Sequence, residues 1–161
     1  MDLVSDARLL ALFFAAFVAA ACEPTGSTPD SPGTTAAGIM TGTIDAYLGD
    51  PRYATADLER GRILSLACQA CHTLGAGEDH NLGPNLFGMF GRPAAQLEGF
   101  EYSEALRDSG VVWTPGVLEA WLAEPNDFVP GNNMVFAGYG SETDRRDLIA
   151  WLLTATSGLE P

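Results

Sequence analysis

Apolar residues recur at the three- to four-residue spacing of amphipathic helices in several stretches after residue 56. In residues 57–70, DLERGRILSLACQA, apolar residues alternate in this way with charged ones. Asp57 and Glu59 lie near the N-terminal end, where the helix dipole favours acidic side chains. The pattern predicts further helices over residues 102–109, 114–124 and 141–158.

Local start and stop signals support these helices. Thr114 followed by Pro115 is typical of a capped helix start with proline in the first turn, and Pro125 ends the pattern. Ser141 and Asp144 have the spacing of a capping box. No stretch alternates with the period of a β-strand, so the sequence predicts an all-α fold with long glycine-rich loops.

One of these loops, over residues 73–100, is too long and irregular for an ordinary connection between two helices. The folded part, expected over residues 55–161, is also small, and short helices in a domain of this size bury little apolar surface. A large apolar cofactor would supply the missing buried surface.

The N-terminus has the pattern of an export signal. Residues 9–21, LLALFFAAFVAAA, form an apolar run that is too short to span a bilayer comfortably and that ends in small residues before Cys22. We therefore expect residues 1–21 to be a signal peptide and the mature protein to be exported to the periplasm.

The residues around Cys22 leave two interpretations open. The segment VAAAC resembles the lipobox of bacterial lipoproteins, in which the cysteine is acylated and becomes the mature N-terminus. Ala19 stands where that pattern prefers leucine. The alternatives are a lipid anchor on Cys22 that associates the protein with the membrane, and simple cleavage after Ala21.

The stretch after Cys22 is expected to act as a tether. Residues 23–43 are rich in Pro, Gly, Ser and Thr and have no periodic apolar face, which predicts a disordered linker. Residues 44–54 are ambiguous, either more linker or a strap packed on the core. We place the linker over residues 22–54 and the folded domain over residues 55–161.

The net charge of the chain limits the kinds of molecule that it can bind. The chain has 21 acidic residues, eight arginines and no lysine, for a net charge of −13. This balance argues against binding nucleic acid or an anionic membrane surface. It favours protein partners with a positive or largely apolar docking patch.

The strongest chemical signal is the segment in which Cys68 and Cys71 stand two residues apart and His72 follows at once. Such a cysteine pair can belong to a zinc site, a redox dithiol or a covalently attached haem. A zinc site would need two more Cys or His ligands at a suitable spacing. Apart from His72, only Cys22, at the end of the N-terminal apolar run, and His80 remain, so zinc is disfavoured. A thioredoxin-like dithiol needs a β-α-β pattern, which does not flank Cys68. His72 favours c-type haem, because a side chain directly after the attachment points can ligate the iron.

A second axial ligand is expected on the opposite side of the iron. Met40 lies in the linker, and Met89, in LFGMFGR, reads better as a loop or core residue. Met134 lies in FVPGNNMVFAG, an irregular segment between two predicted helices in which proline and glycine can bend the chain toward the iron. Met134 is therefore the favoured ligand.

From Gly61 to the last helix, the chain resembles class I cytochrome c, the mitochondrial and small bacterial type. The segments CQACHTL, GPNLFGMFGR, GFEYSEAL, Trp113, FVPGNNMVFAG and DRRDLIAWL follow in that family's order and spacing. The resemblance implies the class I cytochrome c fold, with short helices and long loops around one covalently bound haem c. It also implies an electron carrier rather than an enzyme.

The resemblance implies a role for particular residues. Cys68 and Cys71 resemble the thioether attachment points, and His72 and Met134 resemble the axial ligands. Pro84 matches the proline whose carbonyl accepts the imidazole N–H of the proximal histidine. The residues that match those around the haem propionates, where buried carboxylates need donors, are Arg92, Tyr102 and Trp113.

Other positions match the family or depart from it. Gly61 matches a glycine at the crossing of the first and last helices, and His80 matches a loop histidine that bonds backbone rather than iron. Leu106 replaces a polar residue and Trp121 a tyrosine, both near the methionine side of the haem, and Asn132 stands where threonine is common. These departures predict a drier distal side, which favours ferrous haem.

Two classes of function follow. The first is a single-haem electron carrier, exported and tethered to a membrane, that passes electrons between respiratory or other redox proteins. The second is a haem peroxidase or gas sensor in which Met134 leaves the iron. The sequence has no distal histidine–arginine pair or second haem motif suited to peroxidase chemistry, so the carrier is favoured.

Overall fold

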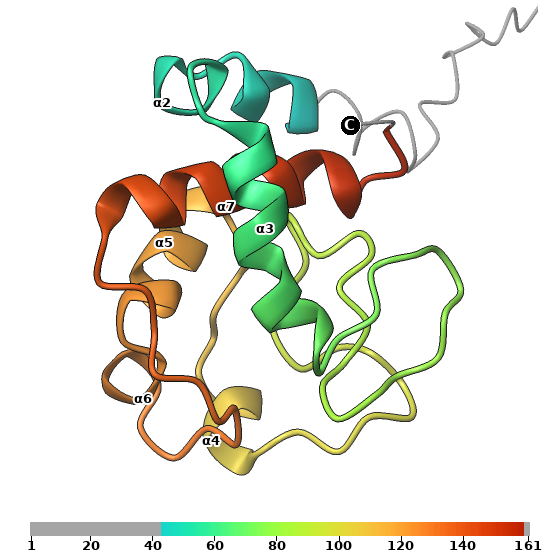
Figure 1. Ribbon diagram of the computed structural model, residues 1–161. Helices are drawn as coiled ribbons and strands as arrows, with labels where there is room; N and C mark the ends of the chain where they lie inside the picture. Colours follow the sequence, from blue (N-terminus) through green and yellow to red (C-terminus); the bar gives the residue numbers. More distant parts are fainter. Residues whose placement is uncertain (1–42, 160–161) are drawn as a thin grey trace, which may run out of the picture. The chain divides into compact units, whose positions relative to one another are not determined.

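The computed structural model describes residues 43–159, which are helical with long connecting loops (Figure 1). Residues 43–48 are helical, and the described part contains no β-strand, only an isolated bridge between Pro93 and Val112. The all-α expectation is confirmed. The helices that follow are α2 Pro51–Ala54, α3 Leu58–Gln69, α4 Glu104–Arg107, α5 Pro115–Ala123, α6 Pro125–Phe128 and α7 Glu142–Ala155.

The helix starts agree with the local signals in the sequence. The hydroxyl of Thr114 accepts the backbone N–H of Val117 at 3.2 Å and caps α5. The hydroxyl of Ser141 accepts the backbone N–H of Asp144 at 3.3 Å and caps α7. Helix α4 is shorter than predicted, because its cap is Ser103 and its four residues end before a turn. Cap chemistry acts over three residues, so it is readable without tertiary context.

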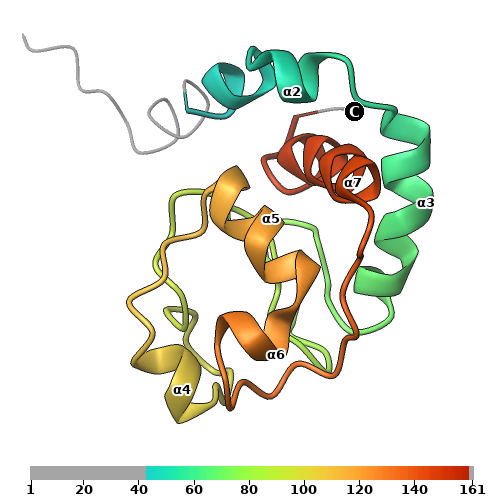
Figure 2. The same ribbon diagram turned by 90° about the vertical axis from the view of Figure 1, so that its left-hand side faces the viewer.

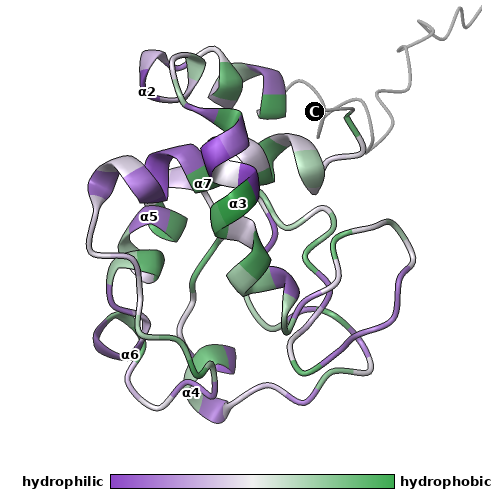
Figure 3. Ribbon diagram, in the orientation of Figure 1, coloured by the Kyte–Doolittle hydropathy of each residue, from purple (hydrophilic) through white to green (hydrophobic). Residues whose placement is uncertain are grey.

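Helices α3 and α7 cross in close contact, as both views show (Figures 1 and 2). Gly61 lies at the crossing, where an added Cβ atom would be 2.1 Å from the backbone oxygen of Asp147. Leu148 and Ile149 of α7 are fully buried. The first turns of α7 are hydrophilic and its later turns are mostly apolar (Figure 3). The helix therefore changes from a solvated start to a buried middle.

The folded part begins before residue 55, where we expected the linker to end. Ile44 and Tyr53 are only 3% and 4% exposed, and the ring of Tyr47 lies 6.5 Å from that of Phe90. Helix α2 packs on α7. Of the two interpretations of residues 44–54, the structure has the packed strap, because aromatic and aliphatic side chains spaced along it reach the core. The expected boundary is corrected accordingly.

The predicted signal peptide, Cys22 and the linker up to residue 42 lie outside the described residues. Between residues 43 and 159, no helix combines the length and the apolar character needed to cross a membrane.

Backbone hydrogen bonds help to hold the long segment between α3 and α4 in place. The N–H of Gly83 donates to the carbonyl of Cys71 at 2.7 Å, and the N–H of Gly88 donates to the carbonyl of Thr156 at 2.7 Å. These bonds fix the loop on α3 and on the end of α7, so an irregular segment becomes one wall of a cavity.

Candidate functional site

A cavity of about 510 Å³ lies between the C-terminal end of α3, helix α5, the long loop and the segment before α7. This volume lies within the range of roughly 300–1,000 Å³ that is usual for cofactor and ligand pockets. The lining is mostly apolar. All eight residues assigned to the site from the sequence line this one cavity: Cys68, Cys71, Pro84, His72, Arg92, Tyr102, Trp113 and Met134.

Helix α3 delivers the two cysteines to the cavity. The N–H groups of Cys71 and His72 both donate to the carbonyl of Cys68, at 3.0 and 2.9 Å, so the chain turns tightly where α3 ends. No disulfide joins the two cysteines. Burial raises the pKa of Cys68 to about 11. A redox dithiol needs a lowered thiol pKa, so this environment disfavours that interpretation of the cysteine pair.

The ring of His72 is held in one orientation. Its Nδ1 lies 2.6 Å from the carbonyl oxygen of Pro84 and donates its proton to it. Gly83 packs against the ring, since an added Cβ atom there would be 2.3 Å from Cε1 of His72. Burial lowers the pKa of His72, against the opposing effect of the Pro84 carbonyl. The neutral tautomer that donates from Nδ1 leaves the lone pair on Nε2, the atom that a metal would use.

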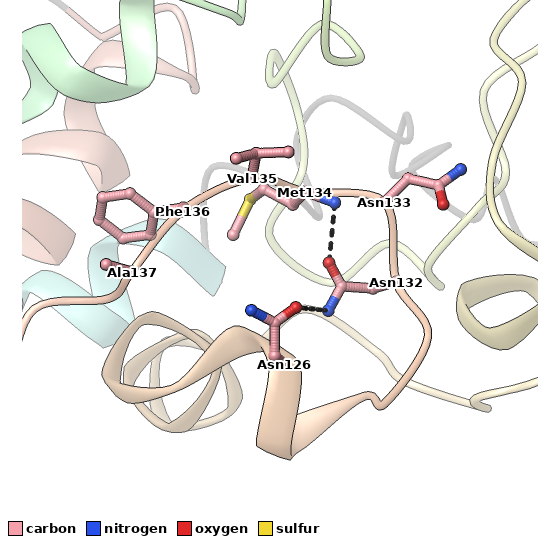
Figure 4. A pocket seen from close by; sticks show the side chains of 7 residues that line it. All are labelled: Asn126, Asn132, Asn133, Met134, Val135, Phe136 and Ala137. Atoms are coloured by element: carbon pink, nitrogen blue, oxygen red, sulfur yellow. Dashed lines mark hydrogen bonds between the residues drawn. The ribbon is translucent and has the colours of Figure 1, made fainter.

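Met134 lies in the non-helical segment between α6 and α7. Its backbone N–H donates to Oδ1 of Asn132 at 2.8 Å, and Figure 4 shows the side chains of Asn132 and Asn126 pointing toward each other beneath this segment. Met134 is partly buried and packs on the core, whereas Met89, which also lines the cavity, is 4% exposed and belongs to the core.

Arg92 places a cation in the cavity wall. Burial lowers its pKa, and its guanidinium donates to the carbonyl of Phe87 at 3.0 Å. Within residues 43–159 it forms no ion pair. A half-buried guanidinium without a carboxylate partner is suited to an anionic group of a bound cofactor. Burial also raises the pKa of Tyr102, which stands beside this cation in the lining.

Trp113 joins two walls of the cavity. Its backbone N–H donates to the carbonyl of Arg92 at 3.0 Å, and its carbonyl accepts from the N–H of Gly91 at 2.7 Å. Its ring meets that of Trp121 edge to face, with centroids 5.4 Å apart. Trp121 and Leu106 line the same space, so two of the three departures from the family are apolar parts of the lining.

His80 is not part of the cavity lining. Its Nδ1 accepts the backbone N–H of Asn85 at 3.0 Å, and its Nε2 lies 3.0 Å from the carbonyl of Glu98, to which it donates. Both ring nitrogens are therefore engaged by backbone groups, as expected for a loop histidine that fixes two segments together.

Sequence reasoning did not find two residues that shape the site. Gly83 has no chemical function of its own, and only its contact with the His72 ring reveals why no side chain fits there. Asn132 was noted only as a departure from a resemblance, although its amide bonds the Met134 backbone. The one local signal was an asparagine two residues before the methionine, a spacing typical of Asx turns.

The fold and the cavity define a helical protein with an attachment site for one covalent cofactor. No family model matches the chain. Cytochrome c of Stellaria longipes is 40% identical over 101 residues, which cover 62% of this chain and 94% of that protein. Cytochrome c of Chlamydomonas reinhardtii is 43% identical over 102 residues, 63% of this chain and 91% of that protein. Cytochrome c2 of Blastochloris viridis is 38% identical over 99 residues, 62% of this chain and 78% of that protein.

The chain therefore belongs to the class I cytochrome c family. It carries one haem c, bound covalently through Cys68 and Cys71, and it is an electron carrier rather than an enzyme. The cavity fits this cofactor, because it combines an apolar lining with an imidazole fixed by Pro84 and a cation, Arg92, that lacks a carboxylate.

Proposed function

We propose that this protein is an exported electron carrier, tethered to a membrane, in which His72 and Met134 are the axial ligands of the haem iron. The observation that carries the assignment is the fixed His72 ring, with Nδ1 bonded to Pro84 and the Nε2 lone pair left for a metal. When bound, the haem supplies a one-electron change between ferric and ferrous iron.

The protein's own residues support that chemistry in three ways. The Pro84 carbonyl keeps the His72 ring in one orientation and makes the imidazole more basic. The apolar lining, including Leu106, keeps water from the distal side. Arg92 offers a positive charge to a haem propionate, with Tyr102 and Trp113 as further donors around it.

The carrier is favoured over a peroxidase or gas sensor by the surroundings of Met134. Its backbone is bonded to Asn132, and the ring nitrogens of His80, the second histidine of the chain, are engaged elsewhere. A six-coordinate iron changes oxidation state with little rearrangement, which is what a carrier needs, whereas a peroxidase needs an open position and an acid–base group beside it.

The ligand assignment is tested by absorption spectroscopy of the ferric holoprotein. Wild type should show the weak long-wavelength band of a methionine sulfur on ferric iron, and Met134→Ala should lose it. Met89→Ala is the matched control and should keep the band. If Met89→Ala loses the band and Met134→Ala retains it, the assignment is wrong.

The tether is proposed from the sequence of the leader. A lipid on Cys22 followed by a Pro-, Gly-, Ser- and Thr-rich stretch would hold the haem domain near a membrane. Because the packed strap begins at about residue 43, the expected linker is about 20 residues long and, as a random coil, would reach roughly 25 Å r.m.s.. Tethering raises the local concentration of membrane-bound partners, so weak docking is sufficient.

Membrane fractionation of wild type and Cys22→Ala, with mass spectrometry of the mature N-terminus, tests the tether. We expect an acylated wild type in the membrane fraction and no acylation in the variant. A wild type that is released in soluble form and starts at an unmodified Cys22 would show that the leader is cleaved without lipidation, and the electron-carrier assignment would stand.

A further inference from the structure

The mouth of the haem cavity is defined by residues that line the cavity and are also exposed to solvent. They are Ala67, Leu82, Glu101, Asn133 and Val135, and we call them the rim. Leu82 is 79% exposed and Val135 is fully exposed. Two large apolar side chains with this exposure at the mouth of one cavity offer an apolar surface that another molecule can cover.

The rim carries one charge, that of Glu101, and no cation. The chain has no lysine, and every arginine between residues 43 and 159 is already engaged. Five of them form ion pairs: Arg52, Arg60, Arg62, Arg145 and Arg146. The other two, Arg92 and Arg107, donate to backbone carbonyls. The rim therefore offers no cation to a partner with an acidic docking patch. The net charge of −13 on this chain would also repel such a partner.

We propose that Leu82 and Val135 dock the redox partner through an uncharged apolar patch on that partner, and not through ion pairs. This inference rests on the proposed function, since it takes the haem in this cavity as the group that exchanges electrons. Salt does not screen the burial of apolar side chains, whereas it does screen contacts between exposed charges. The docking contact therefore persists at high salt.

Voltammetry of the holoprotein on gold monolayers tests the proposal, because the monolayer stands in for the partner's patch. We expect a haem wave on a mixed methyl- and hydroxyl-terminated film, with the same rate constant at low and high salt, and no wave on a carboxylate-terminated film. Leu82→Glu and Val135→Glu should each lower the electron-transfer rate constant on the methyl–hydroxyl film at least fivefold.

Val112→Glu is the matched control. Val112 is 42% exposed and lies outside the cavity lining, so it adds the same charge away from the rim. It should behave as wild type. The proposal is overturned if the wave forms only on an amine-terminated film and disappears with salt, or if the rim variants match Val112→Glu. Haem mass and the methionine–iron band are recorded first, so that failure of haem ligation is told apart from failure of docking.

A separate observation concerns the position of Met134. Asn132 connects the Met134 segment to α6. Its Oδ1 accepts the Met134 N–H at 2.8 Å (Figure 4), and its Nδ2 donates to the carbonyls of Pro125 and Val129, each at 3.0 Å. Nδ2 also lies 3.3 Å from Oδ1 of Asn126. An amide provides an acceptor and two N–H donors at once, whereas threonine has one donor and ionised aspartate has none.

The geometry points to Asn132 as the positioning residue that holds Met134 toward the iron. Replacement by aspartate keeps the acceptor for the Met134 N–H but sets a carboxylate against the carbonyls of Pro125 and Val129. The segment then loses its connection to α6 and Met134 leaves the iron more readily. Threonine, which keeps one donor, should lie between wild type and aspartate.

Imidazole is the probe for this role, because it replaces a methionine ligand on ferric iron and removes the long-wavelength band. Asn132→Asp should bind imidazole at least tenfold faster than wild type. Asn81→Asp is the control, since Asn81 is exposed, lies outside the cavity lining and receives the same charge. Equal imidazole rates in the two aspartate variants would refute the positioning role, and a thermal melt confirms that both are folded.

Discussion

At the α3–α7 crossing, residues of the two helices meet directly: Leu148 and Ile149 are fully buried, and Gly61 brings the backbones into contact. Around the cavity, by contrast, the long loop is connected to the rest of the chain by hydrogen bonds, such as that from Gly88 to Thr156, and by the buried side chains of Met89 and Phe90, while many of its other side chains line an open space. The crossing obtains its buried surface from the chain itself, whereas the cavity wall needs the haem to obtain it.

The crossing also satisfies its charges internally. Asp147 is 1% exposed, and its carboxylate accepts the backbone N–H of Asp57 at 3.2 Å and the guanidinium of Arg146 at 2.8 Å. Arg60 pairs with Asp144 at the same contact. Buried carboxylates are stable only when they are paired in this way, so the polar groups of the crossing require no cofactor. Arg92, in the cavity wall, differs from them because it has no carboxylate partner among residues 43–159.

The largest expected effect comes from removing the haem attachment. In the Cys68→Ala and Cys71→Ala double variant, the cavity loops lose the surface on which they pack, and we expect a chain that is largely unfolded. Circular dichroism should show much reduced helicity and no cooperative thermal transition. A cooperative transition in this variant would mean that the crossing and the strap suffice to fold the domain.

Gly61→Ala should destabilise the α3–α7 crossing. The new Cβ would meet the Asp147 backbone oxygen at 2.1 Å, so the helices must separate, and we expect the free energy of unfolding to fall by about 3 kcal/mol. Gly116→Ala in α5 is the control, because nothing lies within 4 Å of its added Cβ, and helix propensity should there raise stability by about 0.5–1 kcal/mol. Denaturant unfolding of the holoproteins measures both. Equal values would show that the crossing tolerates a wider separation.

Gly83→Ala makes the corresponding change in the cavity wall. The added Cβ would lie 2.3 Å from the His72 ring, which must turn away from the Pro84 carbonyl. We expect a loss of about 1–3 kcal/mol in the holoprotein, together with a changed haem absorption spectrum, which Gly61→Ala should leave unchanged. Gly140→Ala, at a position with open space around its added Cβ, serves as control. An unaltered haem spectrum in Gly83→Ala would mean that the ring is not held by this contact.

The smallest expected changes in stability come from removing one of two tyrosine hydroxyls. The hydroxyl of Tyr53, in the strap, is buried and has no hydrogen-bond partner among residues 43–159, so Tyr53→Phe should raise the free energy of unfolding by up to about 1 kcal/mol. The hydroxyl of Tyr139 donates to the carbonyl of Leu64 at 2.8 Å and connects the end of the Met134 segment to α3. Tyr139→Phe should therefore lower stability by about 1 kcal/mol. Thermal melts that shift in the same direction for both variants would contradict this difference.

Features that depend on neighbouring residues in the chain were predictable. The caps at Thr114 and Ser141 and the stop at Pro125 were readable because a cap is made by groups three residues apart. The attachment site, Cys68 to His72, was readable for the same reason, since five consecutive positions contain the thiols and the imidazole. In these places short-range chemistry determines the structure.

Only the tertiary structure decided the rest. That residues 44–54 pack on the core depends on surfaces supplied by α7, about a hundred residues later in the chain, so the same residues alone were compatible with a linker. The roles of Gly83 and Asn132 likewise depend on what lies across the cavity or beneath the segment. Contacts of this kind join residues whose separation in sequence carries no periodic signal, and they exist only where tertiary folding brings distant parts of the chain together.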